Sequence, residues 1–390
     1  MALIDTHYVH KGKATENQMI TLLKPRLYPE NKKTILITII LFFLIVTICS
    51  ATESYKNANT MKPDSLSDLL LLRAMKSINL DNFKAACANL DSLITIDNSN
   101  WPAYVIKAGI VYTQMTDDED FNREDHFKAL IDTALAGLNA HLTKHPNDKW
   151  GLFFKGTAMG YLALWEAHHG SWVKAVFKGL DAGKIFSKAV QQDSLFYEAY
   201  LGLGTLNYWR SAKMGFLRSL PFIPDKRELG ISQITLAKDN ARYASNAAAL
   251  GLAWIYIDRK EYGRAIAITD RLLKQGLNGR QILWPRGIAN FKRHYAEGTI
   301  EAFSRILESL NRQEGQNYYN ISLCEYYLGL ANYWKGNYAT ALSYLNSLLD
   351  REVEKKVKKR LSKKYKAAKK YKEKIKKQIA EEKKRRSKQS

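Results

Sequence analysis

The chain has 390 residues, 46% of them hydrophobic, with only 22 glycines and 8 prolines, so the composition argues against disordered and turn-rich β architectures. Its three cysteines, Cys49, Cys87 and Cys324, are too far apart for a disulfide framework or a metal motif. The net charge of +22 is uneven, because residues 351–390 hold 20 Lys and Arg and 5 Glu, a net of +15, which leaves +7 for the rest.

Near the N-terminus, residues 34–52 form a run of 19 without a charge, long enough for a helix to cross a bilayer core. Lys32 and Lys33 precede the run directly, and the segment after it is poor in positive charge. The positive-inside rule therefore predicts a transmembrane signal anchor, with basic residues 1–33 in the cytoplasm. We expect a single-pass protein of the inner membrane, with a linker at 53–66 and the remaining domain on the periplasmic side.

Other interpretations of this segment remain open. Cys49-Ser50-Ala51 offers small residues for cleavage of a signal peptide, which would release the protein into the periplasm. The basic region before the signal peptide would then be unusually long, unless translation starts at Met19. Lipid attachment at Cys49 is disfavoured because Ile48 is bulkier than such sites usually have. A buried core helix is disfavoured because it seldom runs this far without a polar face.

From about residue 64 onward, apolar residues recur at three- and four-residue spacing, which predicts helices throughout. Residues 322–355 show the pattern best, with Leu328-Gly329 on a first helix, Gly336 at a turn, then Tyr338 and Ala341. Small residues let two antiparallel helices approach closely, and the aromatic residue fills the gap between neighbouring units. Residues 246–279 and 67–100 repeat the pattern.

This 34-residue pattern resembles the tetratricopeptide repeat, which implies an all-α, right-handed solenoid of helical hairpins. Seven units are expected over 67–355: about 67–100, 101–148, 149–196, 197–245, 246–280, 281–321 and 322–355. The small residue of the first helix recurs at spacings of more than 34 residues in the middle units, at Ala108, Gly156, Gly204 and Ala253. Units two to four are therefore expected to carry about 14 extra residues between their two helices. The sixth unit is expected to have a lengthened turn.

Residues 214–230 form the expected insert of the fourth unit and read MGFLRSLPFIPDKRELG. With the following ISQITLA they are similar to a segment of the eukaryotic helical-repeat family associated with inclusion-body clearance, and of its bacterial relatives. There, an apolar loop ending in an Asp-Arg-Glu-x-Gly-like turn leads into a helix. The similarity covers about 25 residues, against about 290 for the tetratricopeptide pattern.

The tail, residues 356–390, continues as a Lys-rich helix with one narrow apolar stripe, whose start is expected to cap the last repeat. Three interpretations of the tail remain: a solvated helix that frays, a helix lying on anionic lipid with the help of its stripe, or a nucleic-acid binder. The predicted topology makes nucleic acid an unlikely partner, whereas the reverse topology would make it the leading one.

Stacked repeats form a concave groove lined by the first helices of the hairpins. The tetratricopeptide resemblance places partner contacts at positions 2, 5, 9, 12 and 13 of each unit. Aromatic and cationic side chains are what peptide-binding surfaces favour. In this sequence the candidates are Tyr208, Trp209, Trp254, Asp258, Lys292, Arg293, Tyr333 and Trp334. The alternative for the aromatic residues is packing against the next helix, and for the two cations a solvated surface.

No Gly-rich phosphate loop, Gly-x-Ser-x-Gly or His-Glu-x-x-His motif occurs. His168 and His169 are adjacent and lack an evident third ligand, so we predict no metal and no cofactor. The sequence therefore predicts a non-enzymatic, membrane-anchored scaffold or adaptor that binds proteins or peptides in the cell envelope. The alternatives are a nucleic-acid or ribosome binder on the cytoplasmic side, driven by the basic tail, and an enzyme without a recognisable motif.

Overall fold

The structure is a computed structural model that describes residues 65–213, 224–312 and 318–387. The predicted membrane segment at 34–52 lies outside these residues, as does most of the apolar insert at 214–223. Among the helices of the described ranges, none combines the length and the apolar character that a membrane crossing requires.

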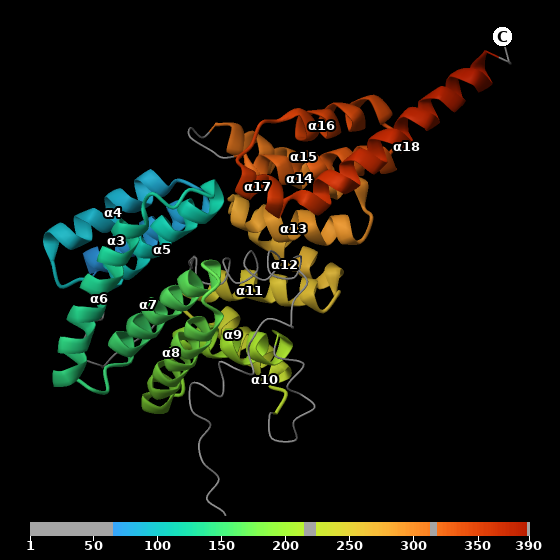
Figure 1. Cartoon of the computed structure of the whole chain (residues 1–390). Helices are drawn as coiled ribbons and strands as arrows, with labels where there is room; N and C mark the ends of the chain where they lie inside the picture. The colour runs from blue at the N-terminus through green and yellow to red at the C-terminus, as the bar shows by residue number, and fades with distance from the viewer. Residues whose placement is uncertain (1–64, 214–223, 313–317, 388–390) are drawn as a thin grey trace, which may run out of the picture.

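The described chain is built of α-helices that pair as antiparallel hairpins, each stacked on the next (Figure 1). This arrangement confirms the prediction of an all-α, tetratricopeptide-like solenoid. The hairpins are α3 (Ser65–Asn79) with α4 (Phe83–Ile96), α5 (Trp101–Asp118) with α6 (Glu124–Lys144), α7 (Lys149–His168) with α8 (Trp172–Gln192), α9 (Glu198–Lys213) with α10 (Arg227–Asn240), α11 (Ser245–Asp258) with α12 (Tyr262–Lys274), α13 (Arg280–Lys292) with α14 (Ala296–Asn311), and α15 (Tyr319–Trp334) with α16 (Tyr338–Asp350).

Small residues set the distance between the two helices of a hairpin. A Cβ added at Gly204 of α9 would lie 2.6 Å from the carbonyl oxygen of Gly230 on α10, and one added at Gly230 would lie 2.6 Å from that of Gly204. A Cβ at Gly156 of α7 would meet the Phe186 ring of α8 at 2.8 Å. The helices can approach this closely only because these positions carry no side chain.

The extra residues of the second and third units lengthen the helices, so the predicted inserts are wrong there. α5 and α6 have 18 and 21 residues, and α7 and α8 have 20 and 21, against 15 and 14 in α3 and α4. The predicted long turn in the sixth unit is also wrong, because α13 ends at Lys292 and α14 begins at Ala296. Continuous apolar periodicity lets a helix absorb several added turns without a loop.

Hydrogen bonds link the first hairpin to the connections before α11 and α13, so the stack curls back on itself (Figure 1). At the α3–α4 turn, the Asn79 carbonyl accepts from the Gly279 N–H at 2.9 Å, and the Asn79 side chain accepts from Gln281 at 2.6 Å. At the other end of α3, Asp68 accepts hydrogen bonds from Arg242 and Tyr243. The α3 helix therefore bridges the α10–α11 and α12–α13 connections.

After α16 the chain turns back over the last hairpin as α17 (Lys355–Arg360) and α18 (Ser362–Arg386). The apolar stripe of this segment faces inward, and its buried members are Val357, Leu361, Tyr365, Ala368 and Ile375. These side chains belong to the same core cluster as α15 and α16. The long basic helix therefore covers the apolar end of the stack, as a terminal cap must.

Candidate functional site

Three of the predicted groove residues lie in the core. Tyr208 is 0% exposed, Trp209 6% and Trp254 3%, and all three belong to the largest core cluster. The rings of Tyr208 and Trp209 pack edge to face with their centroids 5.0 Å apart. These side chains hold neighbouring helices together, which leaves little of their surface for a partner and matches the packing alternative.

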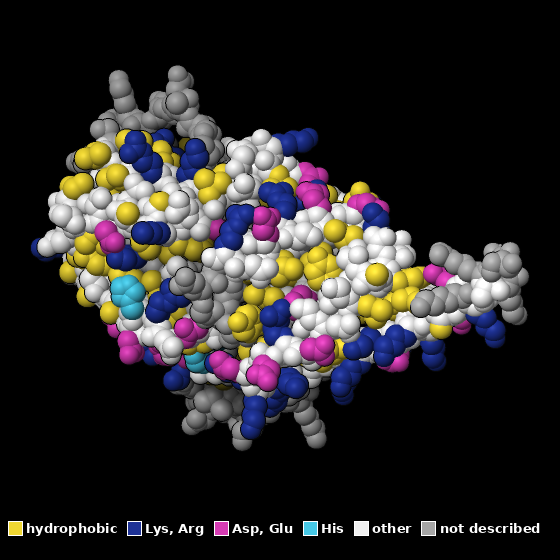
Figure 2. Space-filling view, turned by 90° about the horizontal axis from the view of Figure 1, so that it is seen from above, with side chains coloured by type: hydrophobic (Ala, Val, Ile, Leu, Met, Phe, Trp, Pro, Cys, Tyr) yellow, Lys and Arg dark blue, Asp and Glu magenta, His cyan; other side chains and the backbone are white. Residues whose placement is uncertain are grey.

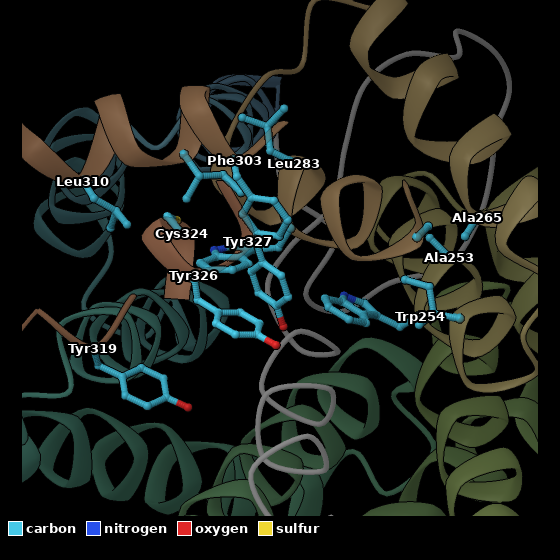
Figure 3. Packing of buried hydrophobic residues seen from close by; sticks show 14 of the residues in the cluster. Ala253, Trp254, Ala265, Leu283, Phe303, Leu310, Tyr319, Cys324, Tyr326 and Tyr327 are labelled. Carbon is cyan, nitrogen blue, oxygen red and sulfur yellow. The ribbon is translucent and has the colours of Figure 1, made fainter. Parts of the chain in front are cut away.

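Their burial follows from the character of the first helices. Every residue from Asn246 to Ile257 of α11 is buried, and so is every residue from Cys324 to Asn332 of α15. Figure 3 shows Trp254 of α11 and Tyr326 and Tyr327 of α15 turned toward the same region between the two helices. A helix that is apolar all round has no outward face, so position counting alone does not identify a partner contact there.

Asp258, at the end of α11, is brought together with one of the other predicted residues. Its Oδ2 accepts a hydrogen bond of 2.8 Å from the Tyr208 hydroxyl of α9. Burial, reinforced by the Asp258 charge, raises the pKa of Tyr208 far above its usual value, so the hydroxyl stays protonated as donor. This pair ties the fourth unit to the fifth.

The remaining candidates gather where α13 and α15 end. Trp334 is half-buried, and its ring lies between Phe291 at 4.8 Å and His294 at 4.7 Å, measured between ring centroids. Lys292 and Arg293 are exposed in the same stretch of α13, and neither forms an ion pair with any residue that the structure describes. We name this group, Phe291, Lys292, Arg293, His294 and Trp334, the Trp334 corner.

A lysine from α18 extends the positive charge toward the corner. The Lys364 ammonium lies 4.4 Å from the Tyr326 ring centroid and 4.7 Å from that of Tyr327, close enough for cation–π attraction. Burial lowers the pKa of Lys364. Partial burial lowers the pKa of Lys292 too, although much of its side chain is exposed, and the Lys364 charge lowers it further. The Lys364 charge thus acts on Lys292, and an anion beside Lys292 would relieve this repulsion.

Tyr333 has different neighbours from Trp334. Its ring packs edge to face against Tyr371 of α18, with centroids 5.1 Å apart. It is half-buried and serves to dock α18. The structure therefore leaves Lys292 and Arg293 exposed, with Trp334 partly exposed beside them, and adds Phe291, His294 and Lys364, which the sequence did not single out. Phe291 and His294 could have been chosen as candidates from the sequence, because they flank Lys292 and Arg293 at the predicted turn. Lys364 could not, because its position depends on how α18 folds back.

The histidine and cysteine side chains considered next pack within the structure and do not form a reactive site. Within the part of the chain that the structure describes, no three His, Cys, Asp or Glu side chains converge as metal ligands. His168 packs on Phe121 with ring centroids 4.5 Å apart, and burial lowers its pKa to about 4. Burial raises the pKa of the Cys324 thiol well above its usual value, which keeps it protonated and unreactive.

No family model and no curated protein matches the sequence. Among solved structures, the chain is similar to the APC/C hetero-tetramer Cut9–Hcn1, at 19% identity and a TM-score of 0.49 over 73% of this chain and 46% of that one. A tetratricopeptide repeat protein from Parabacteroides merdae has 13% identity and a TM-score of 0.35 over 78% and 99% of the two chains. Yeast Tom70 has 14% identity and a TM-score of 0.42, over 93% of this chain and 72% of its own. The chain thus spans about half the length of the first of these.

Proposed function

We propose that this protein is a non-catalytic scaffold, anchored in a membrane by residues 34–52, that binds segments of partner proteins at the Trp334 corner. The observation that carries the proposal is a partly buried indole packed against the rings of Phe291 and His294, beside the exposed Lys292 and Arg293, where α13 and α15 end. Indole and guanidinium groups dominate the binding energy of protein interfaces because they bury large areas at a small entropic cost.

The charge of the corner defines the chemistry of its partner. Lys292, Arg293 and Lys364 are all cationic, and the acidic groups nearby are few: Glu297 lies in the first turn of α14 and pairs with Lys335 at 3.4 Å. A segment with a carboxylate next to an aromatic or aliphatic side chain would satisfy both the cations and the Trp334 face. We therefore propose an acidic, partly apolar peptide segment as the partner.

The proposed location follows from the uncharged run of 19 residues and the lysines before it. The protein would be a single-pass protein of the inner membrane, with residues 53–390 in the periplasm; cleavage after the run would release it there instead. A reporter enzyme fused after Ser390 that works only outside the cytoplasm tests this topology. Activity of a cytoplasm-specific reporter at the same position would refute it.

Partner binding is tested by crosslinking the full chain in native membranes and identifying the partners by mass. We expect Trp334→Ala and Lys292→Ala each to lose the same partners that the unaltered chain captures. Trp172→Ala alters another partly buried tryptophan, on α8; it is the matched control and should retain these partners. Capture that is unchanged by Trp334→Ala would show that the corner is not the binding site.

A further inference from the structure

Lysine dominates the outward face of α18 over residues 363–377. From residue 363 to 377, seven of the eight exposed residues are lysines and the eighth is Glu373, whose carboxylate pairs with Lys376 at 3.0 Å. The seven are Lys363, Lys366, Lys369, Lys370, Lys374, Lys376 and Lys377. We name these seven residues the lysine face. At 1.5 Å per residue the face is about 20 Å long.

The opposite side of α18 is already occupied. Tyr365, Ala368 and Ile375 are buried against the last hairpin, so α18 cannot rotate to present its apolar stripe to a lipid interior without uncovering the core. An amphipathic helix that inserts into a membrane needs that stripe free. While α18 is docked, its stripe is therefore occupied by the protein core, and a lipid contact has to be made by the ammonium groups.

The position of α18 leaves the lysine face accessible to an extended surface such as a membrane. Figure 1 shows α18 running along the last hairpins and projecting beyond them at its C-terminal end. Figure 2 shows Lys and Arg side chains gathered along one side of the projecting arm. The α17 helix adds Lys355, Lys356, Lys358 and Lys359, which are exposed as well.

We propose that the lysine face rests on an anionic phospholipid surface by charge alone, without insertion. This inference rests on the proposed anchor. Residues 53–64 separate the uncharged run from Ser65, and 12 extended residues span at most about 40 Å. An anchored chain would hold its lysines at the bilayer at high effective concentration. Each lysine close to an anionic membrane strengthens binding about fivefold, which corresponds to about 1 kcal/mol.

Nucleic acid is less well matched to this face. Specific recognition of bases relies on arginine or amide side chains, and single strands stack on aromatic rings, whereas the lysine face offers neither. Lysine ammonium groups are compact point charges suited to any dense layer of phosphates. A continuous membrane surface satisfies all seven at once, without a groove or a register.

The test uses the full chain reconstituted into bilayers of phosphatidylcholine alone or of phosphatidylcholine with phosphatidylglycerol. Lysine amines are acylated for increasing times, and the rate at each position is read by mass spectrometry. We expect Lys366, Lys370 and Lys377 to react several-fold more slowly in the anionic bilayer, with the difference lost at high salt because charge contacts are screened. Lys184 on α8, whose side chain is 78% exposed, should react at the same rate in both.

Two variants separate charge from fold. Lys366→Gln, Lys370→Gln and Lys377→Gln together should remove the protection of Lys363 and Lys374. A matched triple variant on exposed positions of α8 should leave that protection intact: Lys174→Gln, Lys184→Gln and Lys188→Gln.

Equal rates in the two bilayers overturn the proposal, and so does protection in the neutral bilayer alone. Protection by added duplex nucleic acid, with none in the anionic bilayer, would replace it with the nucleic-acid alternative. Alkaline carbonate washing of the neutral bilayers tests the anchor separately. Release there would refute the proposed anchoring, whereas the labelling rates report only on the lysine face.

Discussion

Arg280, at the start of α13, binds Asp117, near the end of α5, across 163 residues of sequence. The Nη2 atom of Arg280 lies 2.9 Å from Asp117 Oδ2. Its Nη1 donates to Ser309 Oγ at 2.8 Å, and its backbone N–H donates to Asp81 Oδ2 at 2.8 Å. The side chain is 3% exposed, and its Nε also pairs with Asp81 at 3.8 Å, so one buried guanidinium joins the first two hairpins to the sixth.

Replacing Arg280 by methionine, which keeps the length of the stem, should destabilise the protein by about 3–5 kcal/mol, because it leaves two partly buried carboxylates without their buried cation. The free energy of unfolding is measured by urea denaturation of the full chain in mild detergent, followed by tryptophan fluorescence. Arg312→Met, on an exposed pair with Glu308, is the control and should change stability by less than about 0.5 kcal/mol. Equal losses in the two variants would mean that closure of the stack contributes nothing.

The contact of Gly204 with Gly230 predicts a second effect. Gly204→Ala places a methyl group 2.6 Å from the Gly230 carbonyl oxygen and 2.7 Å from Ile234, so α9 and α10 must move apart. We expect a loss of about 1–3 kcal/mol in the same assay. Gly263→Ala, in α12 with nothing within 4 Å of its new methyl group, should be neutral or slightly stabilising. An equally tolerated Gly204→Ala would show that the helices are not in tight contact.

The helical hairpins could be predicted because their signals are local. The first small position of each unit, such as Gly156 or Gly204, is fixed by how closely its own two helices pack, and the spacing of apolar residues carries that information. The cap was predictable for a similar reason, since the stripe continues past Asp350 at helical spacing.

The closure of the stack and most of the candidate site could not be predicted from local spacing. Arg280 and Asp117 are ordinary charged residues in sequence, and only the curvature of the whole stack brings them together. Counting positions placed Trp254 in a groove, although α11 is apolar on every side and is enclosed. Lys364 joins the aromatic side chains of α15 only because α18 folds back.

The role of α18 as a cap predicts different outcomes for two truncations. Ending the chain after Leu361 removes Tyr365, Ala368 and Ile375 and exposes the faces that they cover on the last hairpin. Each large buried side chain contributes about 1.5–3 kcal/mol, so several kcal/mol should be lost. Ending it after Lys377 keeps these contacts and should cost little. The urea midpoints decide between them, and equal midpoints would show that α18 is not a cap.

Glu198 holds the connection between α10 and α11 from within the core. Its Oε1 accepts from the backbone N–H groups of Arg242 at 2.8 Å and Tyr243 at 2.9 Å, and its Oε2 accepts from that of Ala244 at 2.7 Å. The three N–H groups favour the charged carboxylate, but burial disfavours it more strongly and raises the pKa of Glu198 to about 7, against 4.5 when unfolded. The folded chain therefore binds an extra proton between pH 4.5 and 7.

Stability falls with rising pH wherever the folded state holds more protons than the unfolded state, so Glu198 should cost stability as pH rises through this window. The loss should be on the order of 1–3 kcal/mol. It is measured as the difference in free energy of unfolding between the unaltered chain and Glu198→Gln at pH 5 and at pH 8, which cancels other titrating groups. Relative to this variant, the unaltered chain should be less stable at pH 8 than at pH 5. Glu308→Gln, at an exposed site, should show no such change. A difference of the opposite sign would mean that the three N–H groups outweigh burial, and that Glu198 is ionised in the folded protein.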